Sequence, residues 1–292
     1  VIVKKKNLLG NNNVDAICGQ LHDERVSVII PVNNALTKGV DRLLLSLRKQ
    51  THQNLEFIAV DSGSTDGTQS FLEANGIKVL QIQPHQFTHS FSRNFGAAHA
   101  SGEFLLFTVD DAEFSDPTWL ACCMALLKSM KADSISTAQV TRPAADPYAA
   151  LLGRFLGQAQ AIQPGIYASQ SSFVATFLRK HAPLAFTYSS MPIDDTNHLV
   201  RRNVFEKLKY QGTTVEDIDF GFRLANSGGK IIYTNLLSIV HSHNHSLATL
   251  PKYAKRIYLD WIELQRWNPS IFRFESRKQF IVSSLHVLSE ML

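Results

Sequence analysis

Short β-branched runs alternate with helical segments between residues 25 and 113, and this alternation constrains the fold more than any other feature. Four apolar runs have the length and composition of buried strands, at residues 26–32, 57–61, 77–82 and 103–109. Three segments between them have apolar residues at helical spacing, at residues 41–50, 67–74 and 90–100. Because strand–helix–strand units cross over with one hand, this order predicts an α/β fold with a doubly wound, mostly parallel sheet and a ligand crevice at the carboxyl ends of its strands.

The rest of the chain is patterned less regularly. Beyond Pro117 we expect a helix to about residue 130 and a strand at residues 134–140, followed by a stretch rich in proline and alanine. A helix at residues 217–226 and a strand at residues 230–234 restore the regular pattern. The last 45 residues are helical in period, with an apolar face made by Tyr253, Ile257, Trp261 and Leu264. Two interpretations stay open for them: a helix docked on the domain, or a helix lying on a membrane surface.

The composition excludes several classes of protein. Lysine and arginine number 29 against 25 acids, and the resulting net charge of +4 is too small to indicate a nucleic-acid-binding protein. No apolar run reaches the roughly 18–20 residues that span a bilayer. The basic residues near the N-terminus are not followed by the apolar core of a secretory signal. We therefore expect a cytoplasmic protein, with peripheral contact at the inner face of the plasma membrane as the further option.

The most specific motif follows the second predicted strand and runs from Asp61 to Thr68, Asp-Ser-Gly-Ser-Thr-Asp-Gly-Thr. A carboxylate at a strand tip can accept hydrogen bonds from a base or ribose, and small residues behind it let a ligand approach the backbone. Asp66 can instead cap the next helix, and both roles hold together if Asp61 faces the ligand. Neither Gly-x-Gly-x-x-Gly nor a Walker motif is present, which weakens dinucleotide-binding and P-loop interpretations.

A second group of carboxylates, Asp110, Asp111 and Glu113, ends the fourth predicted strand. Acids crowded at a strand tip repel one another unless a cation neutralises them, and oxygen ligands of this kind suit Mg²⁺ or Mn²⁺. Such an ion would stabilise the charge on a departing diphosphate. The alternative is a solvated acidic turn that caps the following helix.

Three further polar positions complete the candidate site. Glu216 and Asp217 open a predicted helix, where a carboxylate could act as a general base toward a hydroxyl, although acids are favoured in any first helical turn. His241 is the first of three alternating histidines, and it could add an imidazole to a metal ion or be structural. Arg93, early in the third helix, is a natural partner for a phosphate or a base carbonyl, or forms a surface ion pair.

Taken in order, and together with Pro31 and Asn34 after the first strand, these motifs resemble the family-2 glycosyltransferases of the GT-A fold. The Val-His-Ser-His segment and the helix after it are most similar to the bacterial rhamnosyltransferase-like members. The resemblance covers about residues 26–261 and implies one GT-A domain between two extensions. The implied divisions are an N-terminal extension (1–24), a nucleotide-binding half (25–113), an acceptor half (114–247) and a C-terminal helical extension (248–292).

The resemblance implies an inverting hexosyl- or deoxyhexosyltransferase with a UDP- or dTDP-sugar donor and Mg²⁺ or Mn²⁺. The acceptor would be a hydroxyl of a glycan, a lipid-linked sugar or a protein, in bacterial surface polysaccharide or glycoconjugate synthesis. Carried onto this sequence, the nucleotide contacts are Pro31, Asn34, Asp61, Ser62, Arg93 and Asp110. The metal ligands are Asp110, Asp111 and His241, and the catalytic positions are Asp217, as base, and Glu216.

The chain departs from the family pattern at three positions. Asn33 stands in place of an aromatic residue, Ala35 in place of an acid, and Thr108 in place of the first Asp of Asp-x-Asp. The nucleotide pocket is therefore altered, and Asp110 and Asp111 are left to share the ion. Two alternatives remain. One is a degenerate sugar-nucleotide-binding protein without activity, and the other is a nucleotidyltransferase, which would need a basic Gly-rich loop that is missing after the first strand.

Overall fold

The structure is a computed structural model and describes residues 23–142, 166–169, 193–213 and 215–241. The predicted C-terminal helical extension, almost all of the N-terminal extension and parts of the acceptor half lie outside these residues. Within the described part of the chain, no helix has the length and apolar composition that crossing a bilayer requires.

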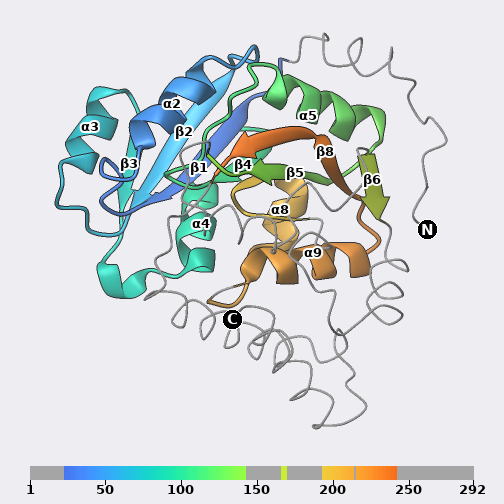
Figure 1. The fold of residues 1–292 in the computed structure, drawn as a ribbon. Helices are drawn as coiled ribbons and strands as arrows, with labels where there is room; N and C mark the ends of the chain where they lie inside the picture. The colour runs from blue at the N-terminus through green and yellow to red at the C-terminus, as the bar shows by residue number, and fades with distance from the viewer. Residues whose placement is uncertain (1–22, 143–165, 170–192, 214, 242–292) are drawn as a thin grey trace, which may run out of the picture.

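Eight described strands form one sheet, in the order β3-β2-β1-β4-β7-β5-β8-β6 (Figure 1). The strands are β1 (Val26–Val32), β2 (Leu55–Asp61), β3 (Lys78–Gln81), β4 (Phe104–Thr108), β5 (Ser134–Val140), β6 (Ile166–Ser169), β7 (Asn197–Arg201) and β8 (Ile231–Val240). The first four strands pair in parallel, as do β5 and β8, whereas β6 and β7 run antiparallel to their neighbours. The prediction of an α/β fold with a mostly parallel sheet is confirmed.

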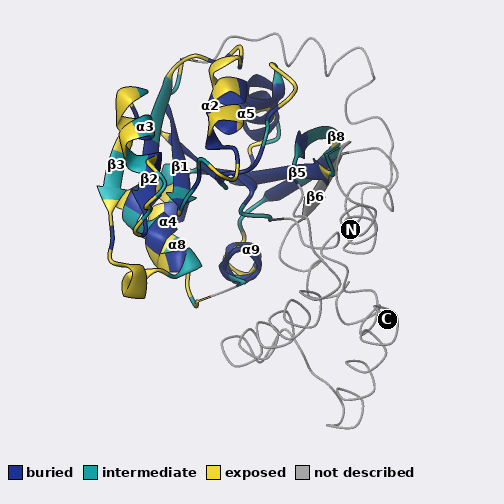
Figure 2. Ribbon diagram, turned by 60° about the vertical axis from the view of Figure 1, so that its left-hand side comes forward, coloured by how far each residue is buried: buried dark blue, intermediate teal, exposed yellow. Residues whose placement is uncertain are grey.

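Helices cover both faces of this sheet (Figures 1 and 2). One face carries α2 (Val40–Arg48), α3 (Thr68–Ala74) and α5 (Trp119–Ser129), and the other carries α4 (His89–Ala98), α8 (Arg202–Leu208) and α9 (Glu216–Asn226). Because side chains alternate along a strand, Val28 and Ile30 pack into the first core while Ile29 packs into the second. The sheet therefore has an apolar core on each side. The polar residues of the candidate site lie at the carboxyl ends of its parallel strands.

Helix α4 packs closely on the sheet because Gly96 has no side chain. A Cβ at this position would lie 2.6 Å from Cγ2 of Ile29 and 3.1 Å from Cγ2 of Val60. The helix begins at a fixed point, since the hydroxyl oxygen of Thr88 accepts a hydrogen bond from the Phe91 N–H at 3.0 Å. As the crossover between β3 and β4, α4 thus brings its first turn to the carboxyl ends of the parallel strands.

The two antiparallel strands, β6 and β7, were not predicted, and β8 continues to Val240 rather than ending at residue 234. In β7 the polar pair Asn197 and His198 interrupts the apolar pattern that strand prediction relies on. Both side chains are buried and hydrogen-bonded: Asn197 Oδ1 accepts from the Thr137 N–H at 2.6 Å, and His198 contacts the Ser134 and Tyr210 hydroxyls. Partners distant in sequence therefore allow a strand that the local pattern does not indicate.

Candidate active site

The antiparallel direction of β7 brings an additional segment to the carboxyl edge of the sheet. Thr108 pairs with Asn197, so the residues that precede β7 lie beside those that follow β4. The Thr108 hydroxyl donates a hydrogen bond to the carbonyl oxygen of Thr196 at 2.8 Å. Asp194 and Asp195 therefore join the candidate site, although the sequence analysis named neither.

Asp61, at the end of β2, holds the turn that follows it. Its Oδ1 accepts hydrogen bonds from Ser64, from the hydroxyl at 2.6 Å and from the N–H at 3.1 Å. Ser64 Oγ in turn accepts from the Asn34 N–H at 2.8 Å, and Asn34 Oδ1 accepts from the Thr65 N–H at 2.8 Å. Asn34 has a left-handed backbone with φ of 49°, which asparagine tolerates. The turn after β2 and the loop after β1 are thus braced against each other.

The other predicted nucleotide contacts on these two strands lie close by. Pro31 is paired with Val60 in the ladder between β1 and β2. The Ser62 hydroxyl donates to the Val32 carbonyl at 3.2 Å. Asp66 accepts from the N–H of Thr68 at 3.0 Å and from its hydroxyl at 2.5 Å, so this second acid holds the start of α3.

Asp110 lies beyond the end of β4 and is met by the loop after β1. Lys38 Nζ lies 3.0 Å from Asp110 Oδ2, and the Asn33 backbone also hydrogen-bonds to this carboxylate. Burial raises the pKa of Asp110, and the neighbouring Asp111 adds to that effect while Lys38 opposes it. Lys38 therefore supplies positive charge at the carboxylate for which a metal ion was predicted.

Asp111 and His241 meet across the sheet edge, with Nε2 of His241 3.3 Å from Oδ1 of Asp111. His241 follows β8, and its Nδ1 lies 2.7 Å from Oε1 of Gln139 in β5. The Gln139 amide also donates to the Asp194 carboxylate. These contacts connect the acids after β4 with the segment before β7.

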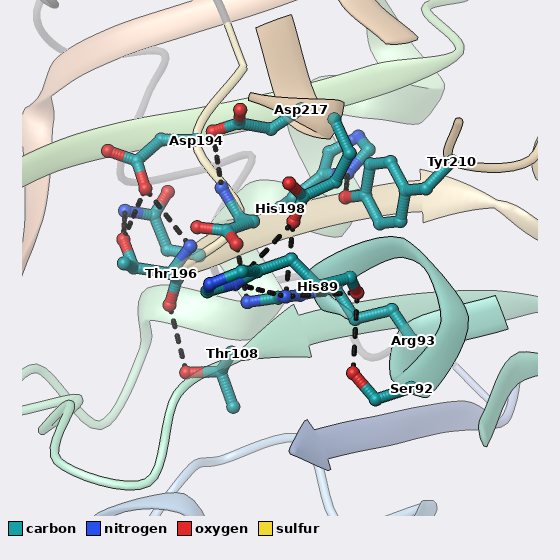
Figure 3. Close-up of polar contacts among 12 residues, drawn as sticks. His89, Ser92, Arg93, Thr108, Asp194, Thr196, His198, Tyr210 and Asp217 are labelled. Atoms are coloured by element: carbon teal, nitrogen blue, oxygen red, sulfur yellow. Dashed lines mark hydrogen bonds and ion pairs between the residues drawn. The ribbon is translucent and has the colours of Figure 1, made fainter. Parts of the chain in front are cut away.

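Arg93 pairs with two of four carboxyl groups that lie close together, and we call the four the acidic cluster: Asp194, Asp195, Glu216 and Asp217. The Arg93 side chain is 1% exposed. Figure 3 shows it among the polar contacts of the site, with Asp194 and Asp217 labelled. Its Nη1 lies 3.1 Å from Glu216 Oε1, and its Nη2 forms an ion pair with Asp195. His89, one turn earlier on α4, has its Nδ1 3.3 Å from Arg93 Nη1 and 3.9 Å from Glu216 Oε1. One guanidinium thus bridges two acids from distant segments.

Asp217 is held by backbone groups. Its Oδ2 accepts from the Asp195 N–H at 3.4 Å, and its Oδ1 accepts from the Ile218 N–H at 2.8 Å. Burial, followed by the charges of Asp195 and Asp194, raises the pKa of Asp217 well above its ordinary value. Burial likewise raises the pKa of Glu216 and of Asp194. For Asp195 burial acts in the same direction, but the Arg93 charge outweighs it and the pKa is lowered. The cluster therefore carries more acid than one guanidinium neutralises.

The backbone before α9 is strained. Val215 has a φ of 51°, a left-handed conformation that is unfavourable for a β-branched side chain. Strain of this kind costs about 1–3 kcal/mol and persists only where the surrounding structure imposes it. Here it turns the chain so that Glu216 and Asp217 enter the cluster from the first turn of α9.

Two sets of side chains in the described residues bring three potential ligand atoms within 4.8 Å of one another: His89 with Asp195 and Glu216, and Asp194 with Asp195 and Asp217. The first set already surrounds the Arg93 charge. The second offers only carboxylate oxygens, the donors that Mg²⁺ and Mn²⁺ prefer. In the set predicted from sequence, Asp111 and His241 touch, whereas Asp110 pairs with Lys38.

Comparison with known sequences gives one family. A family model described as "Glycosyl transferase family 2" matches residues 27–209. The O-antigen chain rhamnosyltransferase WbaN of Salmonella anatum is 26% identical over 251 residues, which cover 85% of this chain and 74% of that protein. The O-antigen biosynthesis protein RfbC of Myxococcus xanthus is 26% identical over 242 residues, 76% of this chain but 18% of the other.

Comparison with solved structures shows a shared fold. The 1–349 fragment of S. aureus TarS superimposes with a TM-score of 0.57 at 18% identity, over 82% of this chain and 65% of that fragment. The same fragment is known in complex with UDP-GlcNAc, with a TM-score of 0.57 at 17% identity. The mannosyltransferase PcManGT of Pyrobaculum calidifontis, in complex with GDP-Man and Mn²⁺, gives a TM-score of 0.56 at 17% identity over 95% of this chain and 75% of the other.

Proposed function

The chain belongs to glycosyl transferase family 2, and from that premise we propose an inverting transfer of a hexose or deoxyhexose from a UDP- or dTDP-sugar to an acceptor hydroxyl in surface polysaccharide synthesis. Its similarity to two O-antigen proteins supports the pathway. The sugar nucleotides bound by TarS and PcManGT support the donor class.

One observation carries the proposal: Asp61, Asp110 and Asp217 are connected along a single edge of the sheet. The loop after β1 contacts the Asp61 turn on one side and Asp110 on the other. From the neighbouring Asp111, contacts run through His241 and Gln139 to the segment that hydrogen-bonds to Asp217. A donor bound at the β1 and β2 ends would therefore point its diphosphate toward Asp110 and its sugar toward the acidic cluster.

Asp217 is the proposed general base. It takes the proton of the acceptor hydroxyl while that oxygen attacks the anomeric carbon and the nucleoside diphosphate leaves from the opposite face, which inverts the configuration. A carboxylate with a raised pKa is a stronger base once ionised, so burial suits Asp217 to this role. Pro31, Asn34, Asp61 and Ser62 are the proposed nucleotide contacts.

We propose that Asp110, Asp111 and His241 would hold Mg²⁺ or Mn²⁺, since two carboxylates and one imidazole can ligate such an ion. Asp111 and His241 are in contact, and Asp110 would have to exchange Lys38 for the ion. Such an ion offsets negative charge on the leaving diphosphate. The Mn²⁺ in the PcManGT complex supports this cofactor. The carboxylate set of Asp194, Asp195 and Asp217 is the second location that an experiment has to separate from the first.

The test is a transfer assay with a panel of UDP-, dTDP- and GDP-sugars in the presence of Mn²⁺, with the anomeric configuration of the product read by NMR. Asp217→Asn should lower kcat by about 1,000-fold, since general-base catalysis contributes 10²–10⁴-fold, and leave nucleotide affinity within about twofold. The matched control is Asp219→Asn on the same helix, because Asp219 pairs with Arg223 at 2.6 Å outside the cluster. A retained configuration, or an undiminished Asp217→Asn enzyme, would refute the mechanism.

The same assay separates the alternatives. A binding-only protein would be stabilised by a sugar nucleotide yet transfer nothing, and a nucleotidyltransferase would release pyrophosphate instead of a nucleoside diphosphate.

A further inference from the structure

We propose that Arg93 is a positioning residue: it locks Asp195 to Glu216, thereby fixes the carboxylate of Asp217, and makes no contact with the sugar-nucleotide donor. The inference rests on the proposed function, because it concerns the base of that reaction. It differs from the nucleotide or phosphate contact that the sequence resemblance implies for this arginine.

The first argument is that the whole Ser-Arg-Asn motif is engaged with the protein itself. The Ser92 hydroxyl donates to the Thr88 carbonyl at 2.8 Å. The Asn94 side chain makes two hydrogen bonds to the Tyr210 backbone, donating to the carbonyl at 2.8 Å and accepting from the N–H at 3.0 Å. Between them, Arg93 faces Asp195 and Glu216 (Figure 3). The motif thus fastens α4 to the segment before β7, to the start of α9 and to the segment after α8. Both terminal nitrogens of Arg93 are used in these contacts, and only its buried Nε is left without a hydrogen-bond partner.

The second argument is the route from Arg93 to the base. One arm of the guanidinium holds Asp195, whose backbone N–H donates to Asp217 Oδ2 at 3.4 Å. The other arm holds Glu216, the residue covalently next to Asp217. The base is therefore held through its hydrogen-bond partner and through its own backbone. A planar fork with several fixed donors can bridge two acids at once, whereas the single ammonium of lysine is a point charge.

The third argument is energetic. The Arg93 side chain is 1% exposed and Glu216 is 3% exposed, so both charges have already lost their hydration. Turning the guanidinium toward a diphosphate would leave the buried Glu216 and the partly buried Asp195 without their cation, an unfavourable exchange. Lys38, which is 45% exposed and lies at Asp110, is free of that constraint. Its side chain is therefore the better placed cation for the donor phosphates.

The experiment compares Arg93→Met and Arg93→Lys with Arg202→Met, a control that breaks an exposed Arg202–Glu206 pair of 2.7 Å. Each variant is assayed at a temperature where circular dichroism shows it fully folded, because Arg93→Met should lower the melting temperature by roughly 10 °C. We expect kcat to fall about 100-fold in Arg93→Met, as a base displaced by about 1 Å loses that much. Arg93→Lys should regain the melting temperature but less than a tenth of the lost kcat. Donor KM and the Kd for UDP and dTDP should stay within about threefold, and Arg202→Met should match the wild type.

A double-mutant cycle tests the route. If Arg93 acts through Asp195, then Arg93→Met/Asp195→Asn should be no slower than the slower single variant, since two changes in one pathway are not additive. A tenfold weaker nucleotide Kd in Arg93→Met would show a donor contact and overturn the proposal. Full recovery of kcat in Arg93→Lys would also overturn it, because charge alone would then suffice. An inactive wild type would count against the proposed function instead, and the nucleotide Kd would still decide whether Arg93 contacts the donor.

Discussion

The turn after β2 and the acidic cluster are both rich in carboxylates and lie on the same edge of the sheet, yet they are held in opposite ways. In the turn, Asp61 and Asp66 bond to hydroxyl and N–H groups two or three residues away. In the cluster, Glu216 meets Arg93 across 123 residues of sequence, and burial raises its pKa although the Arg93 charge opposes the shift. Local hydrogen bonds give the turn a fixed shape, which suits the nucleotide contact proposed for it. Excess acid gives the cluster the capacity to take up protons and cations.

The largest difference between the two regions is expected in Mn²⁺ binding. Asp110→Asn should weaken Mn²⁺ binding about 100-fold, since it removes a proposed direct ligand, and removal of even an indirect partner costs 10–100-fold. Titration calorimetry in the presence of UDP measures the effect. Asp66→Asn is the control, because Asp66 accepts hydrogen bonds from Thr68 at the start of α3 and is not among the proposed metal ligands. A larger loss of Mn²⁺ affinity in Asp194→Asn than in Asp110→Asn would indicate that the ion binds at the acidic cluster.

Acid unfolding probes the side of the sheet beneath the cluster. Burial lowers the pKa of His198 to about 3, whereas an unfolded histidine titrates near 6.5. Between pH 6.5 and pH 3, His198 is protonated in the unfolded chain but neutral in the native state. The free energy of unfolding should therefore fall by about 1.4 kcal/mol for each pH unit by which the pH is lowered through this range. Urea unfolding at pH 7, 6 and 5 tests this. His198→Gln can still bond to the Ser134 and Tyr210 hydroxyls and should show a shallower slope. Parallel slopes would contradict the assignment.

Ser64→Ala should break the turn without touching the cluster. The hydroxyl donates to Asp61 and accepts from the Asn34 N–H, and losing it should cost about 1 kcal/mol and raise donor KM about fivefold. The value of kcat should not change, because the acidic cluster stays intact. Steady-state kinetics measure both constants, and Ser70→Ala, at an exposed position of α3, is the control. A drop in kcat would mean that the two regions are not separable.

Lys38→Met should have the smallest effect. The ion pair of Lys38 with Asp110 is partly exposed, and such pairs contribute about 0.2–1 kcal/mol. Removing a competing cation should therefore tighten Mn²⁺ binding only about threefold. Calorimetry would compare it with Lys49→Met, an exposed lysine at the end of α2. Weaker Mn²⁺ binding would show that Lys38 assists the ion.

Local sequence patterns predicted the strands around the turn after β2, but they gave little indication of the acidic cluster. Residues 26–32 and 134–140 were predicted with the bounds that the structure shows, because each combines β-branched residues with a clear break at its end. The role of Asp66 at the start of α3 could be anticipated, because its partner Thr68 is two residues away. The bonds from Asn34 to Ser64 and Thr65, which span 30 and 31 residues, could not. For β7, the only available indication was the doublet of Asp194 and Asp195, which repeats that of Asp110 and Asp111. Arg93 could be named, but not its partners, because nothing local specifies which strands run antiparallel.

Gly96 gives this arrangement a vulnerability far from any charge. The glycine lets α4 lie against Ile29 and Val60, and Arg93 projects from the same helix one turn nearer its start. A methyl carbon at residue 96 would lie only 2.6 Å from Cγ2 of Ile29, closer than two carbon atoms approach, so α4 would have to move away from the sheet. The Arg93 guanidinium would move with the helix, and Asp195 and Glu216 would lose their common partner. A substitution that removes no polar atom and contacts no substrate would thus lower activity by changing the distance between α4 and the sheet.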